Sequence, residues 1–224
     1  MPYSLPAKTC QTTNVLVASL SLMFANVVTL SPTDDIWAYP HATDPQRDAY
    51  LRVWGVGGVP VAESASDAES FSYSLLQFNT GKVPTGKKLT AAKLIVTHIA
   101  NPSFTVEGAA KTPLEVRSVD GEFKEKGWTY ESLFKLKLDG KETSLFGAAA
   151  PKFTAPDAEF KIEIDLMTGK GNFAEYLSKR VGGPLSLVLT TKLSMDENRQ
   201  TYKIFSKDAE REAARPVLEL TFED

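Results

Sequence analysis

The sequence predicts an all-β protein, a two-sheet antiparallel β-sandwich of the jelly-roll type with one short helix. Three observations lead to this fold class. Apolar and polar residues alternate along most of the chain, as in strands that bury one face. The alternating runs are short and are separated by loops rich in Gly, Pro, Asp and Ser, which is typical of β-sandwiches. With 42% hydrophobic and 24% charged residues, the 224-residue chain can bury a core of its own.

The first two predicted strands are short and lie close together. They are VVTLS (27–31) and IWAY (36–39). The sequence PTDD (32–35) separates them, and its Pro, Thr and Asp residues favour a turn.

The third predicted strand, AYLRVWG (49–55), divides its side chains between two faces. Successive side chains in a strand point to opposite faces. With Leu51 and Val53 in the core, Arg52 and Trp54 are therefore expected to face outward.

The next two predicted strands are joined by a lysine-rich loop. FSYSLLQFN (71–79) and KLTAAKLIVTHI (88–99) flank the loop Thr80–Lys88, in which Pro84 and Gly86 favour a turn. Both faces of the second strand carry apolar residues, which predicts a central position in a sheet. We expect the two strands to pair in the core through Phe71, Tyr73, Leu75, Phe78, Leu94 and Val96.

Six further alternating runs complete the predicted sandwich. In EFKIEIDL the apolar residues occupy one face and the charged residues the other, which predicts a strand with one buried side. The six predicted strands span residues 112–119, 133–140, 159–166, 184–191, 200–206 and 216–222.

One segment departs from the period of two. In NFAEYLSKRVGG (172–183) the apolar residues Phe173 and Leu177 follow helical spacing. Asn172 can cap the first turn, and Gly182 follows the end. This pattern predicts a short amphipathic helix that covers an end or edge of the sandwich.

Charge and motifs argue against several functions. The net charge of −3 favours neither nucleic acid nor an anionic membrane as a partner. Cys10 is the single cysteine, so no disulfide forms within the chain. Because no nucleophile-elbow, zinc-protease or Walker motif occurs, we expect a protein that is not an enzyme and needs no organic cofactor. His41 and His98 belong to no catalytic motif, and His98, in mid-strand, is expected to be structural.

The N-terminal region contains an apolar stretch. VLVASLSLMFA (15–25) has about the length of the apolar part of an export signal, and it lies in a stretch with no charge between Lys8 and Asp34. We expect residues 1–25 to be a signal that is removed, leaving a secreted or cell-surface domain at 26–224 with no membrane insertion. A cytosolic protein whose first strand begins early and a membrane anchor are the alternatives.

Three stretches follow one succession of elements. SLLQFNTGKVPTGKKLTAAKLIVTH (74–98) is an apolar strand, a loop with Pro and Gly, and an alternating strand. DGEFKEKGWTYES (120–132) is an aromatic and acidic loop with a Trp near its end. Residues 162–222 give a strand, a short helix, a strand, the segment YKIFSKD and the closing strand RPVLELTF. This succession resembles the DNRLRE domain, whose members include the carbohydrate-binding modules of family 96.

The resemblance implies a secreted or cell-surface β-sandwich module, and some members of the family bind alginate or similar acidic glycans. The sequence departs from the family pattern at two places. Gln77 and Asn79 stand where the family often has Arg and Asp, and Lys207-Asp208 replaces the more common Arg-Glu. A charge pair that the family builds at these positions need not form in this chain.

Binding of a polysaccharide calls for exposed aromatic rings, whose flat faces match the apolar side of a sugar, together with polar or cationic groups. Cationic side chains would favour an acidic polymer. Trp54 is the leading candidate because it is expected to face outward, whereas Trp128 is expected to be structural. The candidate carbohydrate-binding residues are Trp37, Tyr39, Arg52, Trp54, Lys124, Lys126 and Tyr130.

A structural calcium ion would require oxygen ligands from loops. Acidic residues cluster in SPTDDI and HATDPQRD, although Asp beside Pro and Thr also simply favours turns. The candidate metal ligands are Asp34, Asp35, Asp44 and Asp48.

The sequence thus predicts a non-catalytic module that binds polysaccharide. Two alternatives stay open: a structural or adhesion domain without a sugar site, and a polysaccharide lyase or hydrolase. The sequence does not indicate an oligomeric state or a particular glycan.

Overall fold

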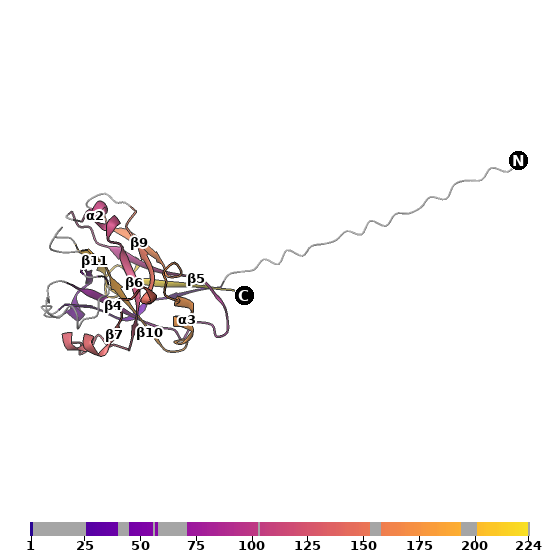
Figure 1. The fold of residues 1–224 in the computed structure, drawn as a ribbon, viewed down its shortest axis with the longest axis horizontal. Coiled ribbons are helices and arrows are strands. Elements are labelled where there is room, and N and C mark those ends of the chain that lie inside the picture. Colours follow the sequence, from indigo (N-terminus) through magenta and orange to yellow (C-terminus); the bar gives the residue numbers. More distant parts are fainter. Residues whose placement is uncertain are drawn as a thin grey trace.

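The computed structural model describes residues 1, 26–39, 45–55, 57, 71–102, 104–152, 158–193 and 201–223. These residues form two antiparallel sheets that pack face to face (Figure 1). The predicted all-β, two-sheet sandwich is confirmed. The predicted export signal, apart from Met1, lies outside the described residues, as do Asp44 and His41.

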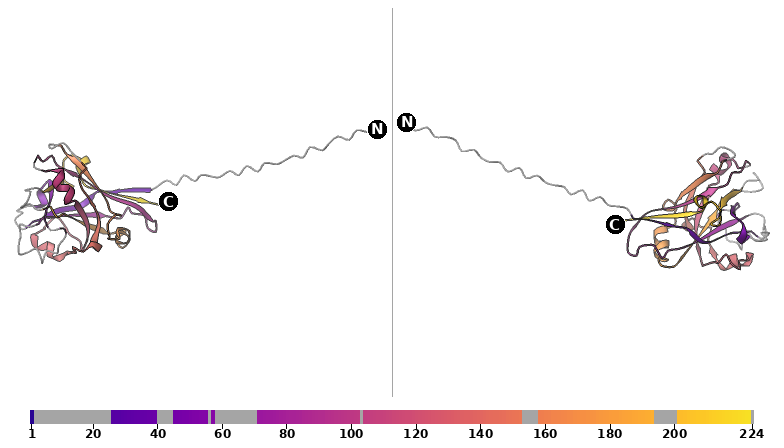
Figure 2. Two further views of the ribbon diagram at one scale, coloured as in Figure 1. Left: turned by 45° about the horizontal axis from the view of Figure 1, so that its top comes forward. Right: turned by 180° about the vertical axis from the view of Figure 1, so that it is seen from behind.

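The first sheet contains six strands in the order β1-β12-β5-β11-β3, with β9 on the other side of β5. As predicted, β5 is a central strand. The N-terminal and C-terminal strands β1 and β12 lie side by side (Figure 2). The strands are β1 (Asn26–Leu30), β3 (Tyr50–Val53), β5 (Leu89–His98), β9 (Phe160–Asp165), β11 (Tyr202–Phe205) and β12 (Val217–Phe222).

The second sheet also contains six strands, in the order β2-β4-β10-β6-β7, and β8 pairs with β6. The chain crosses between the sheets at nearly every step from β1 to β6 and again from β8 to β11, as a jelly roll requires. The strands are β2 (Pro32–Ala38), β4 (Tyr73–Asn79), β6 (Leu114–Asp120), β7 (Lys137–Leu138), β8 (Leu145–Ala149) and β10 (Pro184–Thr190).

The main core lies between the sheets. In β9, Ile162 and Ile164 are buried while Lys161 and Glu163 are exposed, so the predicted alternation is confirmed. The prediction that β4 pairs with β5 is wrong, because β4 belongs to the second sheet and β5 to the first. The two strands meet across the core instead, where Leu76, Phe78, Leu94 and Val96 share one apolar cluster.

A second apolar cluster covers the outer face of the second sheet. The segment from residue 121 to residue 138 lays Phe123 and Trp128 against Tyr73 and Leu75 of β4. Trp128 is 7% exposed and meets Phe123 edge-on, so its predicted structural role is confirmed. This cluster explains why β4 is buried on both faces.

A buried ion pair joins the same sheet to the segment before β8. Arg117 is 2% exposed, and its Nη2 donates to Glu115 Oε2 at 2.9 Å. Its Nε faces Thr190 Oγ1 at 3.3 Å, and its Nη1 donates to the carbonyl of Lys141 at 2.9 Å. The guanidinium is therefore surrounded by acceptors from three parts of the chain, as a buried charge requires.

The predicted helix is present as α3 (Phe173–Ser178), and the side chain of Asn172 accepts a hydrogen bond from the backbone N–H of Glu175. A second helix, α2 (Val106–Lys111), was not predicted; the described residues thus hold two α-helices where one was expected. No helix in the described ranges is long and apolar enough to cross a bilayer. Four short 3-10 helices also occur: η1 (Pro45–Arg47), η2 (Tyr130–Lys135), η3 (Glu142–Ser144) and η4 (Glu212–Ala214).

Two other expectations about elements are wrong, and one strand was not expected. Residues 32–35 do not form a turn, because they belong to β2, which begins at Pro32. The pairing of β2 with β4 shifts register between Pro32 and Asp34, at the turn-favouring residues. Residues 133–140 form mainly η2 and the two-residue strand β7. The strand β8 was not predicted, since LFGAA has no clear alternation.

Candidate functional site

Several predicted carbohydrate-binding residues come together at the edge where β2 and β3 lie close. Trp37 and Tyr39 stack with ring centroids 5.9 Å apart, and Tyr39 meets Trp54 edge-on at 5.1 Å. The Arg52 guanidinium carbon lies 5.0 Å from the centroid of the Trp37 ring. The structure thus groups Trp37, Tyr39, Trp54 and Arg52.

The two tryptophans of this group are not exposed, contrary to expectation. Trp54 is 4% exposed and Trp37 is 7% exposed, while Tyr39 is half-buried. The outward direction of Trp54 was inferred by continuing the alternation of β3, but that strand ends at Val53. Trp54 then pairs with Ser72 through backbone hydrogen bonds of 3.2 and 2.9 Å. Neither tryptophan can present its ring face to a sugar without rearrangement.

Half-buried residues that were not predicted extend the group onto the outer face of the first sheet. Tyr50 of β3 lies opposite Phe205 of β11, with ring centroids 5.5 Å apart. Arg52 lies opposite Lys203 in the same strand pair. Lys203 Nζ lies 4.5 Å from the centroid of Tyr50, and the guanidinium carbon of Arg211 lies 5.5 Å from that of Phe205.

We call this surface the aromatic–cationic face. Its members combine aromatic rings with cations on adjoining strands, and Trp37 and Trp54 lie beneath part of it. The face consists of Tyr39, Tyr50, Arg52, Lys203, Phe205 and Arg211. Tyr50 stands two residues before Arg52, and Phe205 two residues after Lys203, so each aromatic shares a strand face with a cation. The sequence does not reveal that β3 and β11 are neighbours.

The charges of this face are only partly compensated. Burial and the charge of Arg52 lower the pKa of Lys203, whereas Asp48 acts in the opposite direction. The Nε atom of Arg52 is buried and has no hydrogen-bond partner in the described part of the chain. Asp48 Oδ2 accepts a hydrogen bond from Trp37 Nε1 at 2.9 Å. Two cations that face each other, one with an unpaired N–H, form a local site suited to an anion.

The remaining predicted binding residues do not join this face. Lys124, Lys126 and Tyr130 belong to the segment that covers the second sheet. Lys124 is exposed and pairs with Asp34 at 3.3 Å. Burial raises the pKa of Tyr130, whose ring meets Phe134 edge-on.

The predicted metal ligands do not converge. Asp48 binds Trp37 Nε1, and Asp34 accepts hydrogen bonds from the Gln77 side chain and from the Glu125 backbone. Asp35 points elsewhere, because neighbouring residues of a strand face opposite sides. Asp34, Asp35 and Asp48 are therefore not brought together as one group of ligands, and Asp44 lies outside the described residues.

Asp35 instead joins an acidic cluster with Glu125 and Asp208, whose carboxylate oxygens lie within 4.8 Å of one another. Lys207 Nζ lies 2.8 Å from Glu125 Oε2 and 2.6 Å from Asp208 Oδ2. The backbone N–H of Lys207 donates to Asp35 Oδ2 at 2.6 Å. Carboxylates are ligands that calcium prefers, but here an ammonium group supplies the neutralising charge. The cluster is a salt-bridge network, and burial raises the pKa of Asp35 to about 7.

Gln77, one of the positions at which the sequence departs from the DNRLRE pattern, contacts Asp34, the neighbour of Asp35 on β2. Gln77 is buried; its Nε2 donates to Asp34 and its Oε1 accepts from the Phe123 backbone at 3.1 Å. Gln77 therefore ties the covering segment to the second sheet through one hydrogen bond, from the Phe123 backbone, and it bridges to Asp34 of β2 through the other.

His98 is structural, as predicted. It is fully buried, its Nδ1 donates to the Ile99 carbonyl at 2.7 Å, and its Nε2 accepts from the Lys203 N–H at 3.1 Å. Burial lowers the pKa of His98 to about 4, so the ring is neutral near pH 7.

Comparison with known proteins does not identify a family. No protein-family model matches the chain, and no curated protein matches its sequence. The resemblance to the DNRLRE domain therefore remains an expectation that rests on the quoted residues.

Proposed function

We propose that this chain is a non-catalytic module that binds polysaccharide on its aromatic–cationic face, with a preference for an acidic polymer. One observation carries the proposal. Residues predicted from the sequence to bind glycan, Tyr39 and Arg52 among them, are neighbours in the structure and continue into the half-buried pair Tyr50 and Phe205.

The physical fit concerns both parts of an acidic sugar. Aromatic rings offer flat apolar surfaces to the C–H side of a pyranose. Ordering an aromatic side chain on binding costs little conformational entropy, because it has only two rotatable bonds. A carboxylate on the same sugar would meet Arg52 and Lys203, which face each other on adjoining strands. A guanidinium can bind a carboxylate through two parallel hydrogen bonds.

The location of this face on the sheet also supports the proposal. The outer face of the second sheet is covered by the segment 121–138. On the first sheet, Tyr50, Arg52, Lys203 and Phe205 are all half-buried rather than sealed. An extended polymer can reach a partly open sheet face more easily than a covered one.

Native affinity electrophoresis tests the proposal. The full chain is run through gels that contain alginate, a neutral β-glucan or no polysaccharide. The proposal expects retardation by alginate that exceeds retardation by the neutral polymer. Equal mobility in all gels would favour the structural or adhesion alternative. New reducing or unsaturated ends after incubation with the polymer would favour a hydrolase or lyase.

We also propose that the domain acts outside the cell. The apolar stretch 15–25 supports this, because its length suits an export signal. Mass spectrometry of the N-terminus of protein recovered from an expressing culture tests it. Exported protein with a first residue near Asn26 is expected. Protein found only inside the cells, with residue 1 intact, would contradict the proposal.

A further inference from the structure

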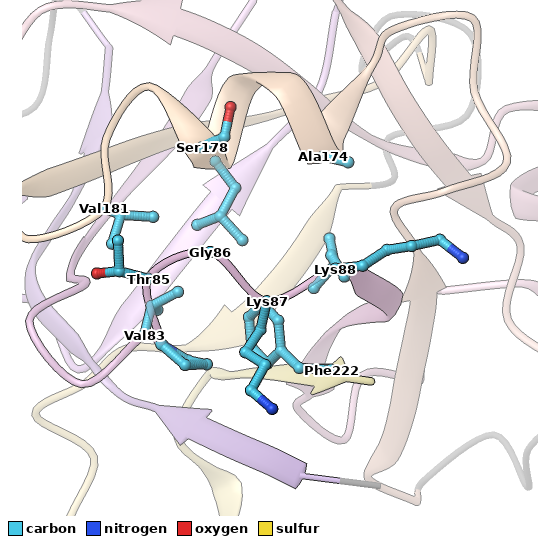
Figure 3. A pocket seen from close by; sticks show the side chains of 12 residues that line it. Val83, Thr85, Gly86, Lys87, Lys88, Ala174, Ser178, Val181 and Phe222 are labelled. Atoms are coloured by element: carbon cyan, nitrogen blue, oxygen red, sulfur yellow. The ribbon is translucent and has the colours of Figure 1, made fainter. Parts of the chain in front are cut away.

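A pocket of about 510 Å³ lies between helix α3 and the loop that joins β4 to β5 (Figure 3). The loop contributes residues 83–89, and β12 contributes Phe222. The helix and the turn after it contribute Ala174, Leu177, Ser178 and Val181. A volume of this size lies within the range of small-molecule sites.

The inner wall of the pocket is apolar. Val83, Leu177 and Phe222 are 5%, 2% and 2% exposed and belong to the main core. Leu89 and Val181 are partly buried and pack against the same core. The pocket therefore opens directly onto the end of the hydrophobic core, and an apolar ligand there would bury surface that water otherwise reaches.

The rim of the pocket is cationic. Lys87 and Lys88 both line it, and in Figure 3 their ammonium ends lie at its periphery. Lys88 forms an ion pair with Glu223 at 2.7 Å. Lys87 is exposed and forms no ion pair with any described residue. Lys87 is thus a cation that pairs with no acidic residue of the described part of the chain and lies beside an apolar pocket.

We propose that this pocket binds a small amphipathic anion, a ligand with an apolar chain or ring and a single carboxylate. Its apolar part lies against Val83, Leu177 and Phe222, and its carboxylate meets Lys87. A sugar is disfavoured because the inner wall offers few groups to pair with its hydroxyls.

This pocket is separate from the aromatic–cationic face. β12 pairs with β5 from Leu89 to Ile95, whereas β11, the neighbour of β3, pairs with β5 at His98, the last residue of that strand. The proposal therefore does not depend on glycan binding.

Isothermal titration calorimetry of the full chain with decanoate and with decanol tests the proposal. Both ligands should bind, and decanoate should bind more tightly. Lys87→Gln should lower the affinity for decanoate by about two- to fivefold, the range expected for the loss of an exposed ion pair. The affinity for decanol should not change. Ala174→Phe places a ring in the pocket and should abolish binding of both ligands while circular dichroism shows an intact fold.

Lys82→Gln is the matched control, because Lys82 is an exposed lysine of the same loop that does not line the pocket. It should bind decanoate as the unsubstituted chain does. The proposal is wrong if decanoate does not bind, if Lys82→Gln weakens it as much as Lys87→Gln, or if folded Ala174→Phe binds normally. A dimer in analytical ultracentrifugation that Ala174→Phe converts to a monomer would instead assign the pocket to a second copy of the chain.

Discussion

Arg52 of β3 and Lys203 of β11 are directly opposite each other on neighbouring antiparallel strands, with both side chains on the outer face of the first sheet. Like charges in this position destabilise a sheet. Tyr50 and the ring of Trp37 each accept one of these cations, but neither supplies a negative charge. A bound anion would relieve this repulsion, which is the physical basis of the preference proposed for an acidic polymer.

The first prediction concerns the pKa of Lys203. The charge of Arg52 helps to lower it. Arg52→Gln should therefore raise the pKa of Lys203, as measured by NMR titration of its side chain. Addition of an oligouronate to the unsubstituted chain should raise it as well. A pKa that does not move in Arg52→Gln would show that the two charges do not interact.

The second prediction concerns Asp35. Burial raises its pKa from 3.8 to about 7, while Glu125 and Asp208 add to the rise and Lys207 opposes it. The folded state thus retains a proton that the unfolded state has lost. The contribution of Asp35 to the free energy of unfolding should be fully present below about pH 4 and be lost as the pH rises to about 7.

Asp35→Asn should remove this decline. The measurement is the difference between the free energies of unfolding of the two proteins in urea at pH 5 and pH 8. The free energy of unfolding of Asp35→Asn should increase relative to that of the unsubstituted chain as the pH rises. Glu219→Gln, a change on β12 away from the cluster, is the control and should show no such trend. A constant difference for Asp35→Asn would contradict the prediction.

The third prediction has the opposite sign. Burial lowers the pKa of His98 from 6.5 to about 4, so the unfolded state binds the proton first as the pH falls. The stability that depends on neutral His98 should be present above about pH 6.5 and be lost toward pH 4. NMR titration of the imidazole in the folded chain checks it, and an ordinary pKa near 6.5 would refute it.

The fourth prediction concerns the buried ion pair. Arg117→Met leaves Glu115 buried without its partner and should lower the free energy of unfolding by about 3–5 kcal/mol. The double change Arg117→Met with Glu115→Leu should recover much of that loss, because no unpaired charge remains. Urea denaturation of the three proteins checks both statements. A loss below about 1 kcal/mol for the single change would mean that solvent reaches the carboxylate.

The sequence predicted the strands whose alternation is regular. β9 is the clearest case, because Ile162 and Ile164 alternate with charged residues and only one assignment buries them. The existence and start of helix α3 were also predictable, since Asn172 caps its first turn, but the helix ends at Ser178 and not at the expected Gly182. β2 was misjudged because turn-favouring residues occur inside an irregular strand, where tertiary pairing with β4 outweighs local preference.

The candidate site was predictable only in part. Arg52 and Tyr39 lie on the candidate face, and their role in binding stays a prediction. The expected exposure of Trp54 is wrong, because β3 ends one residue before it and Trp54 is buried. The importance of Lys203 and Phe205 depends on β11 lying beside β3, and residues far apart in the chain carry no local signal of such pairing. Two of the six residues of the aromatic–cationic face, Tyr39 and Arg52, are therefore sequence candidates, and the other four are found only from the structure.

The leading sequence candidate is no longer the best substitution to test. Trp54→Ala would remove a buried ring from the core, and a large-to-small change of this kind costs about 3–5 kcal/mol. A loss of binding in that variant would not be distinguished from unfolding. Tyr50→Ala and Lys203→Gln alter half-buried side chains at the surface and avoid this difficulty.

The most direct measurement is the retardation of matched variants in native gels that contain alginate. Retardation is the mobility in these gels relative to the mobility of the same protein in gels without polymer, which corrects for the charge that Lys203→Gln removes. Tyr50→Ala and Lys203→Gln should each be retarded less than the unsubstituted chain. Lys161→Gln, an exposed lysine on β9 of the same sheet, should behave as the unsubstituted chain does. Two results would show that the aromatic–cationic face is not a polysaccharide site. One is that alginate does not retard the unsubstituted chain. The other is that Lys161→Gln lowers the retardation as much as Lys203→Gln does.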